Sequence, residues 1–209
     1  MEEKKNILTV EAPFGESRIL LHSCCAPCSS AIVECLLHSG ITPVIYYFNP
    51  NIYPEEEYMH RKEECSRFAA AKGLKIVDAD YDHSAWLEGV RGLEGEPERG
   101  ARCLQCFRYR LLSAARYARD HGIRVVTTTL ASSRWKSLEQ INAAGEWACR
   151  TAAAETETVT EPVWWDRNWR KDGLQQRRQE LLKEYEFYNQ LYCGCEFSMT
   201  SALLQPEKK

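Results

Sequence analysis

The sequence has no hydrophobic run long enough to cross a membrane. Its longest apolar stretches, such as residues 44–48, are far shorter than the ~20 residues that a bilayer needs. The opening MEEKK leads into no apolar signal-peptide segment. An apolar fraction of 44% with 27% charged residues excludes a disordered, collagen-like or low-complexity chain. We therefore expect a cytoplasmic globular protein with no membrane partner.

An excess of basic charge is also absent, because 27 Lys and Arg face 30 Asp and Glu, for a net charge of −3. Net charge reports on solubility, so it predicts no nucleic-acid partner by itself. Residues 99–124, however, contain seven arginines and one acid, Asp120. This segment is either a phosphate-binding stripe, which we favour because it adjoins a cysteine pair, or a solvated helix face. The Trp-rich stretch 164–171 leaves a similar choice between base stacking and core packing.

Cysteine is abundant, yet disulfides explain it poorly. Ten cysteines in 209 residues, about 5%, are too few for a disulfide scaffold, and no secretion signal is visible. Clustered thiols predict metal or redox chemistry. The three clusters are Cys24, Cys25 and Cys28; Cys103 and Cys106; and Cys193 and Cys195, whereas Cys35, Cys65 and Cys149 are expected to be structural. Thiolates alone do not distinguish zinc from iron at the second cluster.

The first and third clusters differ in their chemistry. Adjacent Cys24 and Cys25 cannot easily form a relaxed disulfide, but both can ligate one cluster or two neighbouring metals. Their predicted place at a helix N-terminus should lower their pKa values, and that of Cys28 as well. A disulfide between Cys193 and Cys195 would be strained and easily reduced. That pair is therefore either a redox pair or a pair of metal ligands.

The hydrophobic pattern alternates between short strands and helices. Strands are predicted at residues 18–22, 42–48, 74–77 and 125–130, and helices at 28–38, 55–72 and 106–120. This alternation predicts an α/β fold: a parallel sheet with helices on both faces, and ligands beyond the carboxyl ends of the strands. The first cysteine cluster lies at such an end. We divide the chain into a polar tail (1–16), an α/β core (17–130) and a helical C-terminal appendage (131–209) that carries Cys193-Gly194-Cys195.

Four motifs together resemble epoxyqueuosine reductase of the QueH type. They are LHSCCAPCS at 21–29, RCLQCF at 102–107 with Arg110-Leu111, TTTL at 127–130, and YCGCEFS at 192–198. The resemblance extends from about Ser17 to Ser198. It implies a fold related to the HUP class, a 4Fe-4S cluster, and reduction of epoxyqueuosine to queuosine at the wobble position of tRNA by electrons from an external donor.

The resemblance also implies a role for each cysteine cluster. It assigns the 4Fe-4S cluster to Cys24, Cys25, Cys103 and Cys106. Cys193 and Cys195 would be a catalytic redox pair, or would bind an adjacent mononuclear iron whose site Cys28 could complete.

Two further roles concern residues outside the cysteine clusters. The Tyr81-Asp82 pair matches a recurring feature of the family, which implies that Asp82 faces the substrate and delivers a proton. For tRNA binding we expect Arg102, Arg116 and Arg119 from the arginine-rich segment, with the last two pointing outward from their helix.

Two other functions stay open on the residues alone. An ATP-dependent tRNA-modifying enzyme of the same fold class would need a Gly-rich loop after the first strand to cradle phosphates, and CCAPC stands there instead. A zinc-stabilised RNA-binding module would use the same thiols without redox chemistry. Bound zinc without a redox-active colour would favour that module.

Overall fold

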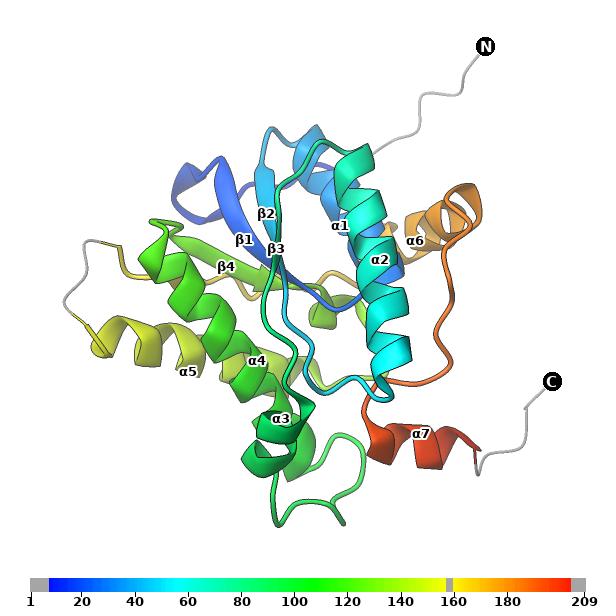
Figure 1. Ribbon diagram of the computed structural model, residues 1–209. Helices are drawn as coiled ribbons and strands as arrows, with labels where there is room; N and C mark the ends of the chain where they lie inside the picture. Colours follow the sequence, from blue (N-terminus) through cyan, green and yellow to red (C-terminus); the bar gives the residue numbers. More distant parts are fainter. Residues whose placement is uncertain (1–7, 157–159, 204–209) are drawn as a thin grey trace.

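A five-stranded parallel sheet forms the centre of the protein in a computed structural model that describes residues 8–156 and 160–203 (Figure 1). The spatial strand order is β3-β2-β1-β4-β5. The strands are β1 (Arg18–Ser23), β2 (Thr42–Tyr47), β3 (Ile76–Asp78), β4 (Val125–Thr128) and β5 (Val163–Trp164). This architecture confirms the predicted α/β fold. Because the chain moves outward from β1 to β3 and then returns to β4, the order reverses between β1 and β4, where ligands bind in open α/β sheets.

Helices cover both faces of the sheet: α1, α2 and α6 lie on one side, and α4 and α5 on the other (Figure 1). The helices are α1 (Ala26–His38), α2 (Glu55–Ala71), α3 (His83–Gly89), α4 (Ala101–Asp120), α5 (Leu138–Ala154), α6 (Leu174–Glu184) and α7 (Glu196–Leu203), with 3₁₀ turns η1 (Pro13–Gly15) and η2 (Thr129–Ser132). Among the described residues, no helix combines the length and the apolar composition that a membrane span requires.

Strand β1 is the middle of the hydrophobic core. Its residues after Arg18 are buried, as both faces of a central parallel strand must be. Leu21 pairs with Ile45 of β2 on one side and with Thr127 of β4 on the other. This register brings the ends of β1 and β4 side by side, so the residues that follow Ser23 and Thr128 become neighbours.

Three elements differ from the sequence prediction. Helix α4 begins at Ala101 rather than near residue 106, so Cys103 as well as Cys106 lies within its first two turns. Residues 83–89, for which no helix was predicted, form α3. Strand β5 is only two residues long and lies in the Trp-rich stretch, where Trp165 N–H donates to the Val126 carbonyl at 2.8 Å.

The portion beyond residue 130 contributes to the sheet as well as to the helices. It supplies β5 and the covering helix α5. Trp165 and Trp169 are buried, and the Trp169 indole donates to Thr127 Oγ1 at 3.1 Å. These two indoles therefore pack in the core rather than stack on bases. The domain boundary at residue 130 stays a prediction, and residues 1–7 of the predicted tail lie outside the described residues.

Candidate metal centre and adjoining pocket

The thiols of Cys24, Cys25 and Cys28 form a compact triad at the carboxyl end of β1. Cys25 is the residue before α1, and Cys28 lies in the first turn of that helix. Their three sulfur atoms all lie within 4.8 Å of one another, and the sulfurs of Cys24 and Cys25 are 3.8 Å apart. Three sulfur donors at this spacing could hold a metal. The triad therefore forms a candidate metal centre at the point where the strand order reverses.

Two polar side chains contact the triad from distant parts of the sequence. Thr129, just after β4, accepts a hydrogen bond from the Cys24 backbone N–H at 3.1 Å, and its hydroxyl donates to Cys24 Sγ at 3.3 Å. The Gln190 amide donates to Cys25 Sγ at 2.9 Å and lies 4.0 Å from Cys28 Sγ. Thr129 belongs to the TTTL motif, but the sequence analysis assigned it no role. No motif or pattern in the sequence indicated Gln190.

The triad thiols differ in acidity. Hydrogen bonds from Cys25 and Cys28 hold the pKa of Cys24 well below its ordinary value, and Lys136 and Thr129 act in the same direction. Burial raises the pKa of Cys25, and the hydrogen bond to Cys24 raises the pKa of Cys28 to about 11. The lowered pKa predicted from the helix N-terminus is thus found for Cys24 and is wrong for Cys25 and Cys28. Burial and a shared proton outweigh the helix dipole at these two thiols.

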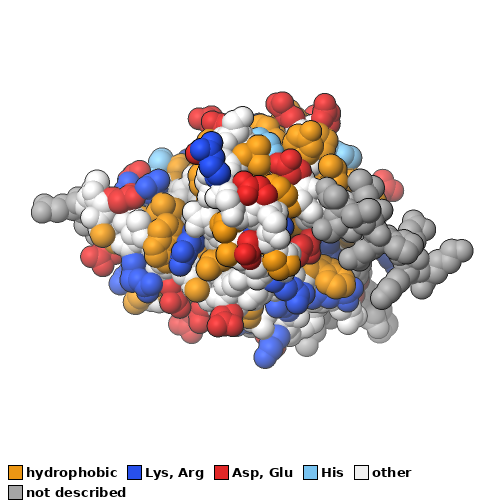
Figure 2. Space-filling view, turned by 90° about the horizontal axis from the view of Figure 1, so that it is seen from below, with side chains coloured by type: hydrophobic (Ala, Val, Ile, Leu, Met, Phe, Trp, Pro, Cys, Tyr) orange, Lys and Arg blue, Asp and Glu red, His pale blue; other side chains and the backbone are white. Residues whose placement is uncertain are grey.

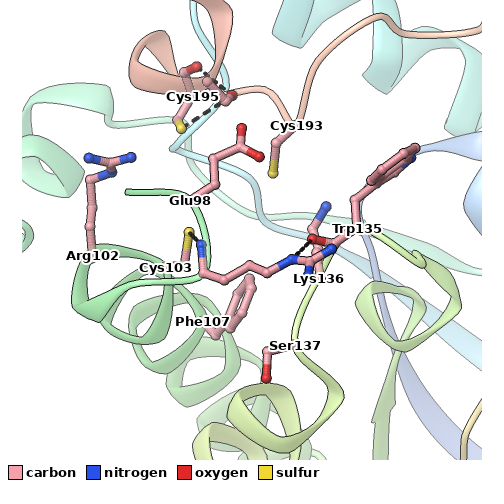
Figure 3. Close-up of a pocket in the computed structure, with 11 residues that line it drawn as sticks. Glu98, Arg102, Cys103, Phe107, Trp135, Lys136, Ser137, Cys193 and Cys195 are labelled. Carbon is pink, nitrogen blue, oxygen red and sulfur yellow. Dashed lines mark hydrogen bonds between the residues drawn. The ribbon is translucent and has the colours of Figure 1, made fainter. Parts of the chain in front are cut away.

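The second and third cysteine clusters meet at a pocket beside the triad (Figure 3). The Cys103 and Cys193 sulfurs point toward the space between them, and the Glu98 carboxylate lies between Cys193 and Cys195. Cys103 Sγ accepts a hydrogen bond from the Arg99 backbone N–H at 3.3 Å. The other lining residues are Arg99, Arg102, Phe107, Trp135, Lys136, Ser137 and Ser198. Thiols that are 90 residues apart in sequence therefore face one cavity.

Cys106 lies behind this pocket rather than on its wall. It is buried, and it packs in a small apolar cluster with Trp86, Val90 and the partly buried Cys195. Burial raises the pKa of Cys106, while the Arg110 charge opposes the rise. Burial also raises the pKa of Cys195 to about 12. Burial therefore disfavours the thiolate form of both residues.

Lys136 connects the pocket to the triad electrostatically. Burial disfavours its charge, but the nearby Cys193, Cys24 and Cys28 sulfurs raise its pKa above the ordinary value. The side chain lines the pocket and is directed into it (Figure 3). Lys136 therefore supplies a positive charge shared by two cysteine clusters, and the sequence analysis did not identify it.

The Cys193-Gly194-Cys195 turn is held from the side of α2. The buried Arg61 guanidinium donates to the carbonyls of Cys193 at 3.3 Å and Tyr192 at 3.4 Å, and pairs with Glu57. The Gly194 carbonyl accepts from Tyr53 N–H at 2.8 Å. Gly194 has φ +127°, and a Cβ there would lie 3.1 Å from Ile52 and 3.2 Å from Arg61. Only glycine meets both requirements without strain.

A second buried arginine, Arg110, lies behind the cysteines without a negative partner. It is 2% exposed, and its guanidinium donates to Asn49, whose amide in turn donates to the Ser23 carbonyl at 2.9 Å. Its Nε has no hydrogen-bond partner, and it forms no ion pair with a carboxylate of the described residues. A buried cation of this kind is costly unless an anionic group lies close by.

Asp82 takes a structural position away from this pocket. Its exposed carboxylate caps α3 by accepting the Ala85 N–H at 2.8 Å, and it is not among the residues that line the pocket. Its expected proton-donating role stays a prediction.

The three arginines expected to bind tRNA are all engaged within the protein. Arg102 lines the pocket but is buried, and its guanidinium donates to the Glu94 carbonyl at 2.7 Å. Arg116 and Arg119 both pair with Glu155, about 20 Å along α4 from Cys103 at 1.5 Å per residue. The outward orientation predicted for Arg119 is wrong, because its side chain is only 9% exposed. The role of these arginines in tRNA binding stays a prediction.

Comparison with known proteins points to one family. Residues 19–201 match the family model described as epoxyqueuosine reductase QueH. A Haemophilus influenzae protein of that name is 48% identical over 190 residues, which cover 91% of this chain and 75% of the relative. The Acinetobacter baylyi protein of the same name is 45% identical over 192 residues, 92% of this chain and 85% of the relative. The Thermotoga maritima protein of the same name is 30% identical over 187 residues, which cover 87% of this chain and 90% of the relative.

Proposed function

The chain belongs to the epoxyqueuosine reductase QueH family, and we propose that it reduces epoxyqueuosine to queuosine in the anticodon wobble position of tRNA. The reaction removes the epoxide oxygen and leaves an alkene and water, so it consumes two electrons and two protons. The proposal includes an external electron donor and, because the substrate is tRNA, a cytoplasmic location. The observation that carries the proposal is the meeting of three cysteine clusters at one end of the sheet.

We assign a 4Fe-4S cluster to four of the thiols. The other three would bind an adjacent iron, or two of them, Cys193 and Cys195, would form a redox pair. The first group is Cys24, Cys25, Cys103 and Cys106, and the second is Cys28, Cys193 and Cys195. The family resemblance supports this division, and the triad geometry supports metal binding at Cys24, Cys25 and Cys28. When bound, a cluster of this type supplies single electrons.

The surrounding charges suit an anionic, thiolate-bound group. Arg110 is a buried cation with an unpartnered Nε, and Lys136 lies within the field of both Cys24 and Cys193. A site of four thiolates carries negative charge that these two side chains would balance. A site without such a group would leave Arg110 buried and uncompensated.

The residues around the thiols have separate tasks in the proposed reaction. Thr129 and Gln190 donate hydrogen bonds to the sulfurs of Cys24 and Cys25, which stabilises negative charge on them. The positive charge of Lys136 likewise stabilises negative charge on the Cys193 sulfur, from the side of the pocket. Phe107 adds an apolar side chain to the lining of the pocket.

The test combines metal analysis with a direct product assay. Protein purified without oxygen should contain about four irons and four acid-labile sulfides per chain. With dithionite and epoxyqueuosine-containing tRNA it should form queuosine, measured by mass spectrometry of the digested nucleosides. Cys24→Ala should lose both iron and product. Cys149→Ala is the matched control, because Cys149 is a buried α5 thiol outside the three clusters.

One outcome would contradict the proposal. Stoichiometric zinc without iron or sulfide, persisting after anaerobic reconstitution, together with no queuosine formation, would leave the zinc-stabilised RNA-binding module as the better description.

A further inference from the structure

We propose that Arg99, Arg134, Lys136 and Arg170, together with the exposed indole of Trp135, form an RNA-binding surface at the mouth of the cysteine pocket. This surface rests on the proposed function, since it takes tRNA as its ligand. Arg99 precedes α4, residues 134–136 lie between η2 and α5, and Arg170 follows β5. Trp135, Lys136 and Arg99 also line the pocket (Figure 3). A nucleic-acid strand bound here would therefore lie directly beside the proposed reaction site.

The four basic side chains of this surface lack the acidic partners that many other arginines have. Arg116 pairs with Glu155, Arg177 with Glu34, and Arg167 with Asp172. Within residues 8–156 and 160–203, none of the four forms an ion pair, and neighbouring Glu98 forms none with them either. The positive charge of the three arginines stays available for a ligand, whereas that of Lys136 is shared with the cysteine clusters. Phosphate oxygens are the anions that RNA presents most densely.

The backbone arrangement holds these charges in place. Arg99 Nε donates to the Trp135 carbonyl at 2.7 Å, and Arg170 Nη2 donates to the Lys136 carbonyl at 2.9 Å. Each guanidinium has five N–H groups, so these bonds leave others for a phosphate. Burial lowers the pKa of Arg170, and the nearby Arg99 charge lowers it further. Two cations this close repel each other, and an anion bound between them would remove the repulsion.

Trp135 adds a stacking surface to the cationic group. Its side chain is 66% exposed, and the Arg134 guanidinium lies 4.8 Å from the ring centroid. Exposed aromatic rings beside basic side chains bind unpaired nucleotides by stacking on their bases. A space-filling view of this end of the protein shows a group of basic side chains next to hydrophobic ones (Figure 2). The combination suits an anticodon loop better than a duplex, whose bases are not available for stacking.

The test measures tRNA affinity separately from catalysis. Binding of fluorescein-labelled, epoxyqueuosine-containing tRNA to the anaerobic holoenzyme is followed by anisotropy between 50 and 300 mM KCl. Arg134→Gln should weaken binding by at least about fivefold and reduce the slope of log K against log[KCl] by about 1. Trp135→Leu should weaken binding by about tenfold without changing the slope. Arg150→Gln, which removes one 72% exposed charge from α5, should leave both quantities unchanged.

The outcomes separate this surface from the proposed chemistry. Both variants should keep the wild-type iron content, and Arg134→Gln, which is not among the residues that line the pocket, should also keep the wild-type rate of queuosine formation with dithionite at saturating tRNA. Wild-type-like affinity and salt slope in Arg134→Gln and Trp135→Leu would overturn the inference even if the enzyme is an active reductase. Unchanged tRNA binding with a loss of rate only when a protein reductant replaces dithionite would also overturn it, in favour of an acidic protein partner. Failure of the wild-type protein to make queuosine would refute the proposed reductase activity. The tRNA affinities of the variants and the wild type could still be compared.

Discussion

The buried guanidinium of Arg61 donates a hydrogen bond to the Cys193 carbonyl at 3.3 Å, across 132 positions of sequence. The same side chain forms an ion pair with Glu57 one turn earlier on α2. Helix α2 therefore sets the position of a cysteine turn that belongs to the far end of the chain. Together with the hydrogen bond from Tyr53 N–H to the Gly194 carbonyl, this contact fixes the backbone that carries the two thiols.

Arg61→Met is expected to destabilise the protein by about 3–5 kcal/mol. It leaves the Glu57 carboxylate, which is 12% exposed, without its partner, and such a loss in a buried pair is strongly unfavourable. Urea unfolding followed by circular dichroism measures the change. Arg91→Met is the control, because Arg91 is 74% exposed and its pair with Glu88 lies on the surface. Equal effects of the two substitutions would show that Arg61 does not hold the cysteine turn.

Gly194→Ala should reduce queuosine formation by at least about tenfold. Its Cβ would press on Ile52 and Arg61, and the positive φ adds about 1–3 kcal/mol of backbone strain. Gly40→Ala separates these effects, because Gly40 has φ +74° but no neighbouring atom within 4 Å of an added Cβ. We expect Gly40→Ala to lower stability and spare activity. A similar loss of activity in both variants would attribute the effect to stability alone.

Gln190→Met is expected to weaken metal binding by about 10-fold to 100-fold. The substitution keeps the length of the side chain and removes the amide that donates to Cys25 Sγ at 2.9 Å. Competition with a chelator, followed by the visible spectrum, measures the affinity. Gln176→Met is matched to it, since the Gln176 amide donates to Glu180 on the exposed surface of α6. An unchanged affinity in Gln190→Met would remove Gln190 from the metal centre.

Acid should weaken the contact between α4 and α5 through Glu155. Hydrogen bonds from Arg116 and then Arg119 lower the pKa of Glu155 from 4.5 to about 2. Because the folded-state pKa is the lower one, the stabilisation is complete above about pH 4.5 and disappears as the pH falls to about 2. The contribution is below about 1 kcal/mol, since these side chains are partly exposed to solvent.

Urea midpoints between pH 5 and pH 2.5 test this dependence. Glu155→Gln should flatten the decline relative to wild type, whereas Glu146→Gln, whose carboxylate lies 3.8 Å from Arg150, should not. Parallel declines in wild type and Glu155→Gln would contradict the assignment.

The fold and the first cysteine cluster were predictable because their signals are local. Strand, cysteine turn and helix follow one another directly at residues 18–38, so a short window of sequence contains the geometry of Cys24 and Cys28. Strand β5 was missed because a two-residue strand is defined by its neighbour β4 rather than by its own periodicity.

The missed functional contacts depend on tertiary neighbours. Thr129 meets Cys24 only because β1 and β4 pair across 105 positions. Lys136 and Gln190 are common polar residues, and neither residue type indicates a functional site by itself. The orientation of Arg119 was predicted wrongly because helical periodicity separates an apolar face from a polar one but does not reveal that α5 packs beside α4 and brings Glu155 to its end.

The distance in sequence between Cys25 and Gln190, 165 positions, also sets an order of events during synthesis. A ribosome releases the β1–α1 segment first, and domains begin to fold from their N-terminal part as they emerge. The triad thiols therefore leave the ribosome long before the amide that contacts Cys25 has been made. During that interval they are open to oxidation and to stray metals, so the proposed metal centre would be assembled on the finished chain.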